Sequence, residues 1–258
     1  STPALLDAII SSFTPDFLPG NHGDENKGES SYSDFSVSLY PGQFVQELTY
    51  QRMKGFYVVN TADFVANLPE DSAYLLFPDL KRTFYGGSTA YILNSDFSIE
   101  NLVYQREWQR YSTGSFVPRF NYSYAEFSND FEDFKGKEKD FDFSLDLNYY
   151  YNWVLAERFN LSPYAYGGLG TRIQNYRQSG DKLNEKESNT YFTQEYGGGL
   201  QLGYNTDKFL MGARVSYKSL NYKNASDLRI QNDSWYGLFF IGYRLDPPEN
   251  LKRIGDQF

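Results

Sequence analysis

The sequence predicts an all-β protein: a transmembrane antiparallel up-and-down β-barrel of about ten to twelve strands, with a short N-terminal helix or extra strand. Three observations predict this fold. Aromatic residues make up 19% of the 258 residues although the mean hydropathy is −0.60, which suits strands with one aromatic and one polar face. Long segments alternate between apolar and polar residues. The longest uncharged stretch, 159–171, is shorter than the ~20 residues of a membrane-spanning helix.

Residues 1–32 are predicted to form a separate N-terminal segment. Five apolar residues in it recur at helical spacing: Leu5, Leu6, Ile9, Ile10 and Phe13. This spacing favours a short amphipathic helix, and a strand is the alternative. The stretch 19–31 is rich in Gly, Asn and Asp and is predicted to be a loop. The segment is therefore a helix followed by a loop, or a remnant of the first strands of the barrel.

The barrel is assigned to residues 33–245. Its clearest strand is 141–155, where every odd position is apolar or aromatic and most even positions are Asp, Asn or Ser. Residues two apart on a strand share a face, so this strand has one apolar and one polar face. The stretch 96–110 is a strand that changes parity, which a bulge or a protein-filled interior would explain. Noisier alternation predicts the other strands at 35–39, 48–58, 83–93, 116–124, 159–173, 192–204, 209–217 and 235–245.

The end of the chain is predicted to close the barrel and then to leave it. Strand 235–245 is expected to pair with the first strand, because an open sheet edge is not stable in lipid. Residues 246–258 contain two adjacent prolines and are predicted to form a C-terminal tail outside the sheet.

Alternation alone fits a soluble barrel as well as a membrane barrel. Three features favour the membrane. Several strands exceed the ~9–11 residues that span a bilayer, aromatic residues gather toward strand ends, and the non-aromatic face carries charge. The alternative is a soluble, aromatic-rich, carbohydrate-binding β protein.

The membrane interpretation assigns side chains to two environments. Seven residues are predicted to face lipid: Phe141, Phe143, Leu145, Leu147, Tyr149, Tyr151 and Trp153. Seven charged residues are predicted to form a polar cluster in the lumen: Arg106, Arg110, Arg119, Asp142, Asp146, Arg172 and Arg214.

Composition excludes several kinds of chemistry. A formal net charge of −9 is unfavourable for nucleic-acid binding. The absence of cysteine excludes disulfides, thiolate nucleophiles and cysteine-bound metals. The single histidine, His22, lies in a Gly/Asn/Asp loop without a nucleophile elbow nearby, so it is expected to be a solvated loop residue. Asp140, Asp142 and Asp146 share a strand face by ordinary alternation. We therefore expect no catalytic residue, no metal and no cofactor.

One stretch resembles a known family. It comprises Phe77-Pro-Asp-Leu80, Gly86-Gly-Ser88, Tyr91-Ile-Leu-Asn94, Gln105-Arg-Glu107 and Ser112-Thr-Gly-Ser-Phe116. These elements, with 50–57, resemble the signature of uncharacterised bacterial proteins best represented in Bacteroidetes and known only as a domain of unknown function. The resemblance implies an exported outer-membrane β-barrel and no assigned activity. Members of that family usually have additional strands before the part that matches residue 33.

These observations predict a non-enzymatic barrel in the outer membrane of a Gram-negative bacterium. The expected role is a structural or accessory subunit of an outer-membrane protein assembly, and a narrow, porin-like channel is the alternative. The expected partners are outer-membrane lipid and other outer-membrane or periplasmic proteins, without nucleic acid.

Overall fold

The computed structural model describes residues 31–58, 75–102, 107, 109–131, 134–180, 183–223 and 229–244. Within them the chain forms one sheet whose strands follow the order of the sequence, and every neighbouring pair is antiparallel. The strands are β1 (Ser31–Leu39), β2 (Phe44–Val58), β3 (Leu75–Tyr91), β4 (Thr113–Phe131), β5 (Phe134–Ala156), β6 (Phe159–Gly180), β7 (Leu183–Asn205), β8 (Phe209–Lys223) and β9 (Arg229–Tyr243).

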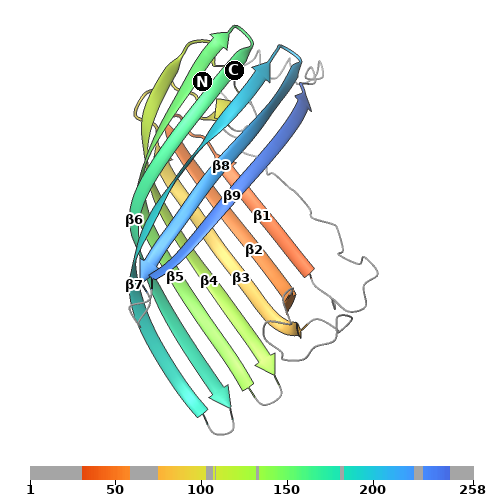
Figure 1. The fold of residues 1–258 in the computed structure, drawn as a ribbon, viewed down its shortest axis with the longest axis vertical. Helices are drawn as coiled ribbons and strands as arrows, with labels where there is room; N and C mark the ends of the chain where they lie inside the picture. Colours follow the sequence, from red (N-terminus) through yellow and green to blue (C-terminus); the bar gives the residue numbers. More distant parts are fainter. Residues whose placement is uncertain are drawn as a thin grey trace, which may run out of the picture.

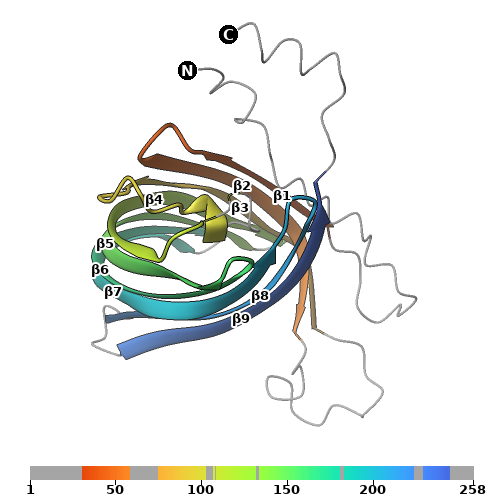
Figure 2. The same ribbon diagram turned by 90° about the horizontal axis from the view of Figure 1, so that it is seen from above.

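The sheet curls into an open half-barrel (Figures 1 and 2). An all-β, antiparallel up-and-down architecture is therefore confirmed, with nine strands in the described part of the chain. The predicted N-terminal helix or extra strand and the C-terminal tail lie outside the described residues. No described helix is long and apolar enough to cross a membrane.

The two ends of the sheet have different connections. At one end the strands are joined through 40–43, 92–112, 157–158 and 206–208, and we call this the plug end. The opposite end, where β5, β6 and β7 extend furthest, is the far end (Figure 1). The β1–β2 turn at the plug end contains Gly42 with a φ of 66°, a left-handed conformation that glycine adopts without strain.

Alternation places polar side chains on the concave face and apolar ones on the convex face. On β5, Asp146, Asn148 and Asn152 are buried, whereas Leu145 and Leu147 are exposed. The same alternation places inward-pointing tyrosine rings over glycines of the neighbouring strand. Tyr166 lies opposite Gly197, and a Cβ on that glycine would come within 2.7 Å of the tyrosine ring. Only glycine therefore leaves room for the ring at this position.

Two predictions about strands are not met within the described residues. The described residues of 96–110 do not form a strand: the described part of 92–112 turns to the concave side and contains one 3₁₀ turn, η3 (Glu100–Leu102) (Figure 2). The parity change therefore reflects a protein-filled interior. In addition, β9 pairs with β8 but not with β1. Because β1 and β9 are separated by seven antiparallel strands, they run in the same direction and cannot close an antiparallel barrel directly.

Candidate functional site

The candidate site is the concave interior, which is filled with protein at the plug end. We define the plug as the described residues of 92–112. The hydrophobic core lies here: Ile92, Phe97, Ile99 and Leu102 of the plug are buried against inward side chains of β2, β3, β4 and β5. The ring of Phe97 stacks on Tyr150 with 6.0 Å between centroids. The plug is therefore packed as part of the interior.

Amide side chains of the strands hold the plug backbone. Asn152 Nδ2 donates to the carbonyl of Ser98 at 3.0 Å, and Gln201 Nε2 donates to the carbonyl of Asn101 at 3.1 Å. Asn160 also donates to the Asn101 side chain. Gln201, Asn152 and Asn101 are at most 1% exposed. These buried amides donate hydrogen bonds to backbone carbonyls of the plug, as an irregular segment in a protein interior requires.

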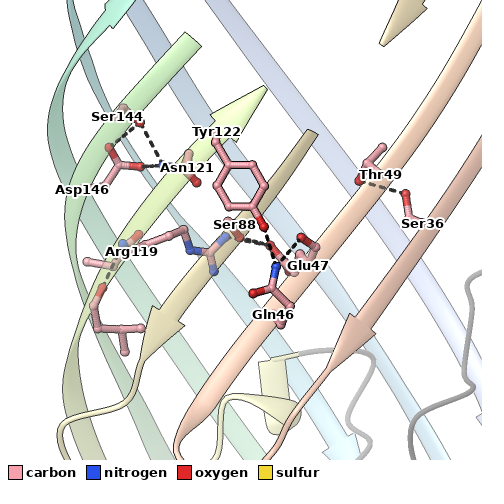
Figure 3. Close-up of polar contacts among 12 residues, drawn as sticks. Ser36, Gln46, Glu47, Thr49, Ser88, Arg119, Asn121, Tyr122, Ser144 and Asp146 are labelled. Atoms are coloured by element: carbon pink, nitrogen blue, oxygen red, sulfur yellow. Dashed lines mark hydrogen bonds and ion pairs between the residues drawn. The ribbon is translucent and has the colours of Figure 1, made fainter. Parts of the chain in front are cut away.

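Beyond the plug, the interior is lined by ion pairs. Arg119 contacts Glu47 at 3.0 Å, and Ser88 donates to the same carboxylate at 2.9 Å (Figure 3). Asn121 donates to Asp146, as Figure 3 also shows.

Two further pairs lie toward the far end. Arg172 Nε contacts Asp142 at 2.6 Å, and its Nη2 donates to the other oxygen at 3.2 Å. Lys218 contacts Glu195 at 2.9 Å. Together with the Arg119–Glu47 pair, these two pairs line a cavity of about 380 Å³. Because each cation has an acidic partner, the cavity presents mixed charge with no excess of one sign among these pairs.

Most of the predicted lumen cluster lies on the concave face. Arg119, Asp142, Asp146 and Arg172 line or border the cavity. Arg214 also points inward, but its guanidinium donates to the amide oxygen of Gln201 at 2.9 and 2.6 Å instead of meeting an acid. It therefore helps to orient an amide that holds the plug.

Of the remaining two arginines, the structure describes only Arg110. Arg110 is exposed, since it lies where the plug leaves the interior toward β4. Its assignment to the lumen stays a prediction. Arg106 lies outside the described residues.

All seven residues predicted to face lipid project from odd positions of β5. Leu145 is 64% exposed and Leu147 is 53% exposed, and Phe143, Tyr149 and Trp153 are also exposed. Phe141 and Tyr151 are half-buried. The Phe141 ring packs on the neighbouring convex ring of Tyr124 with 5.0 Å between centroids. These side chains of β5 therefore contribute a row of aliphatic and aromatic groups to the convex face.

The convex face also has a groove and a polar exception. The groove, of about 580 Å³, crosses β1 to β5, and its lining includes Phe35, Leu48 and Tyr85. One such exception is Gln46, whose amide donates to the Tyr122 hydroxyl at 2.8 Å and accepts from Thr89 at 2.7 Å. Both polar ends of this amide are satisfied by neighbours on the same face.

Sequence reasoning missed Glu47 and the amides that hold the plug. The inward position of Glu47 could have been predicted from the alternation, because Leu48 and Tyr50 occupy the opposite parity of the same strand. The Gln201–Asn101 contact had no such signal, since its partners are 100 residues apart and one lies in an irregular segment. Among the described residues, no group of three or more His, Cys, Asp and Glu could hold a metal ion.

Comparison with known proteins decides the family. A family model described as "Domain of unknown function (DUF4421)" matches residues 10–245, which is most of the chain. The chain belongs to this family. DUF4421 is an uncharacterised family, so membership brings no assigned activity. No curated protein matches this DUF4421 chain.

Two solved structures share limited similarity with this DUF4421 chain. The ferric yersiniabactin uptake receptor FyuA from Yersinia pestis is 9% identical with a TM-score of 0.33; the match covers 83% of this chain and 34% of the receptor. A major outer membrane protein from Thermus thermophilus is 11% identical with a TM-score of 0.24; the match covers 84% and 98% of the two chains. The chain thus spans about a third of the receptor's length.

Proposed function

We propose that this DUF4421 protein is a non-enzymatic β-barrel of the outer membrane of a Gram-negative, Bacteroidetes-type bacterium. One observation carries the proposal: large apolar side chains cover the convex face, while the concave face beyond the hydrophobic core of the plug is polar and charged. A soluble barrel has the opposite arrangement, because water contacts its outside and its apolar groups pack inside. A transmembrane barrel has an apolar band outside and a polar interior.

The expected orientation in the membrane follows from the connections. Outer-membrane barrels have short periplasmic turns and longer extracellular loops. Apart from 92–112, which turns into the interior, the connections at the plug end are short, and β5, β6 and β7 extend furthest at the opposite end, so we assign the plug end to the periplasm. The far end, where β5 and β7 are each 23 residues long, would then project beyond the bilayer to the outside.

We infer a structural or accessory role in an outer-membrane protein assembly in preference to transport. The packed plug supports this role, because a lumen filled by buried side chains and amide contacts at one end offers no open path for solutes. The partners would be outer-membrane lipid and other outer-membrane or periplasmic proteins.

The proposal of no enzymatic activity rests on the residues available. The chain has no cysteine, and its one histidine, His22, lies outside the described residues. A serine nucleophile on the described strands would therefore have only carboxylates or amines as a base.

Purification from native outer membranes in mild detergent tests the proposed role. We expect the protein to leave the column with one or more outer-membrane or periplasmic proteins in fixed stoichiometry. An isolated protein that conducts ions in planar bilayers, without associated proteins, would contradict the assembly role and favour the channel.

A narrow channel is the second candidate, favoured by the charged cavity of about 380 Å³ beyond the plug. Single-channel recording separates the two candidates. We expect the intact protein to be non-conducting and a variant with 95–110 replaced by a Gly/Ser linker to conduct. The variant Leu93→Ser is the control, because Leu93 is an exposed plug residue and its replacement leaves the packing in place. Conductance of the intact protein at the level of the linker variant would favour the channel.

A further inference from the structure

Toward the far end, the convex face changes from aromatic to basic. Side chains directly opposite each other on paired strands share a face, and so do residues two apart on one strand. Four residues beyond the convex ring of Tyr50, the register places one row across β2 to β7: Lys54, Lys81, Ser128, Lys137, Arg177 and Lys186. A second row lies between that row and the aromatic rings: Arg52, Thr83, Glu126, Lys139, Asn175 and Ser188. We call these two rows the basic belt.

The belt concentrates positive charge on a chain whose formal net charge is −9. Its two rows contain seven Lys and Arg residues and one acid, Glu126, which contacts Lys137 at 2.7 Å. Lys54 lies directly opposite Lys81, and Arg177 has a lysine opposite it on each side. Like charges in such positions destabilise a sheet. Within the described part of the chain, the Glu126–Lys137 contact is the only ion pair that a belt residue forms, so a bound anion would offset this repulsion.

Two further acids of the same face lie on the outer side of the belt. Asp79 and Asp130 are each two residues farther out on β3 and β4, and Asp130 contacts Lys135 at 3.0 Å. On the inner side, the next row contains no charged residue: Phe35, Tyr50, Tyr85, Tyr124, Phe141, Ile173 and Thr190. The belt therefore presents its positive charge at the border of the apolar band.

The apolar groove of the convex face, of about 580 Å³, begins beside the belt. Tyr50 and Phe141 line the groove, and each lies two residues from a belt cation on its own strand, Arg52 and Lys139. One row farther toward the plug end, the lining continues with Leu48. Cations that border an apolar groove are complementary to an amphiphile with an anionic head group.

We propose that the basic belt and this groove bind a phosphate-bearing glycolipid of the outer leaflet, with phosphates on the belt and an acyl chain in the groove. The inference rests on the proposed membrane location, in which the far end lies outside. Aromatic girdles of membrane barrels lie at the membrane interface. At ~3.3 Å per residue, the belt lies roughly 7–13 Å beyond the aromatic row along the strands, toward the lipid head groups.

The width of the belt favours a large head group with more than one charge. Strands lie ~4.8 Å apart, so a belt across β2 to β7 extends over roughly 24 Å. Lys and Arg form charge-assisted hydrogen bonds with phosphate oxygens, and the guanidinium of Arg177 can bind two oxygens at once. Phosphates set apart on the sugars of one lipid match this spread better than the single phosphate of a phospholipid.

Lipid titration of the full-length protein in a neutral detergent tests the belt. The variant Lys81→Gln with Arg177→Gln removes two belt cations, and the control Arg158→Gln with Lys208→Gln removes the same charge from exposed turns at the plug end. We expect wild type and control to bind purified phosphorylated lipid A equally, and the belt variant to bind it roughly tenfold more weakly. Wild type should lose a similar factor with dephosphorylated lipid A of the same acylation and with phosphatidylglycerol.

A second pair of variants tests the groove without a change of charge. The variant Leu48→Trp fills part of the groove, whereas Leu147→Trp adds the same ring at an exposed convex position outside it. We expect weaker binding of phosphorylated lipid A with Leu48→Trp and wild-type binding with Leu147→Trp. Equal binding by these two variants would overturn the place of the acyl chain.

The other outcomes are equally decisive. Equal binding of phosphorylated and dephosphorylated lipid A by wild type would overturn the site without any variant, and so would equal binding by the belt variant and its control. Equal binding of phosphatidylglycerol would overturn the glycolipid as the ligand. Membrane fractionation separates these failures from that of the proposed function. Protein found in the outer membrane without this selectivity refutes the lipid site alone, and protein absent from that fraction refutes the membrane location.

Discussion

The two faces of β5 differ in what surrounds them, although they alternate residue by residue. On the convex face Leu145 is 64% exposed, whereas on the concave face Asp146 is 4% exposed and accepts a hydrogen bond from Asn121. Which side chains of β5 are buried therefore depends on where the plug and the ion pairs lie. The hydrophobicity of a side chain does not predict its burial. In the proposed membrane location, lipid solvates the apolar surface, and internal polar partners satisfy the buried polar surface.

The largest expected effect comes from the packed part of the concave side. The variant Phe97→Ala removes a ring that is 4% exposed and stacks on Tyr150, so we expect a loss of roughly 3–5 kcal/mol in the free energy of unfolding. The matched variant Leu93→Ala, at an exposed plug position, should change it by about 0.5 kcal/mol or less. Denaturant unfolding of the reconstituted protein measures both. Equal small losses would show that the plug is not packed inside the barrel.

A charge on the convex face should be the next most damaging change. The variant Leu145→Arg places a cation in the apolar band, and we expect a loss of roughly 2–4 kcal/mol near the bilayer midplane. The concave variant Ser123→Arg is the control. It enters the polar cavity on the strand beside Asp142, so it should be tolerated. If both variants unfold at the same denaturant concentration, the two faces do not differ in environment.

Asn148 shows that the concave face does not accept every polar substitution. From the sequence alone we expect Asn148→Asp to be tolerated, because both residues are polar and the position faces inward. The structure changes this expectation, since Asn148 Nδ2 donates to the carbonyl of Val117 at 3.0 Å and aspartate has no such donor. We now expect Asn148→Asp to destabilise by roughly 1–3 kcal/mol in the same unfolding measurement, and a wild-type midpoint would contradict this.

Ion pairs in the cavity should contribute less than the packed plug. The Arg172–Asp142 pair is bidentate and its side chains are 22% and 29% exposed, so we expect a coupling energy of about 1 kcal/mol in a double-mutant cycle. The Lys135–Asp130 pair, with side chains 68% and 64% exposed, should show almost none. Equal coupling in the two pairs would show that the cavity is as well hydrated as the strand ends.

The smallest expected effect is that of His22→Ala. We expect unchanged membrane insertion and a free energy of unfolding within about 0.5 kcal/mol of wild type, because the sequence predicts a solvated loop residue at this position. Insertion assays and denaturant titration measure the two quantities. Loss of a lipid-modifying activity on this single substitution would contradict the non-enzymatic proposal.

The fold was predictable from local pattern, but closure and the plug were not. Alternation in 141–155 correctly indicates which side chains share a face, because a period of two follows from strand geometry alone. The path of 92–112 depends on contacts such as Asn152 to Ser98, between residues far apart in sequence, which no periodicity records.

The most direct test of the lipid-exposed convex face is the oxygen accessibility of a nitroxide on β5. Single cysteines are introduced one at a time from 141 to 153, labelled and reconstituted, and relaxation is measured with oxygen and with a water-soluble nickel chelate. We predict that odd positions such as Leu145 and Leu147 are accessible to oxygen and protected from nickel. Even positions such as Asp146 should not show this combination of high oxygen accessibility and low nickel accessibility. Odd positions protected from both reagents, with even positions accessible to nickel, would contradict the membrane barrel and indicate a soluble protein with a dry aromatic core.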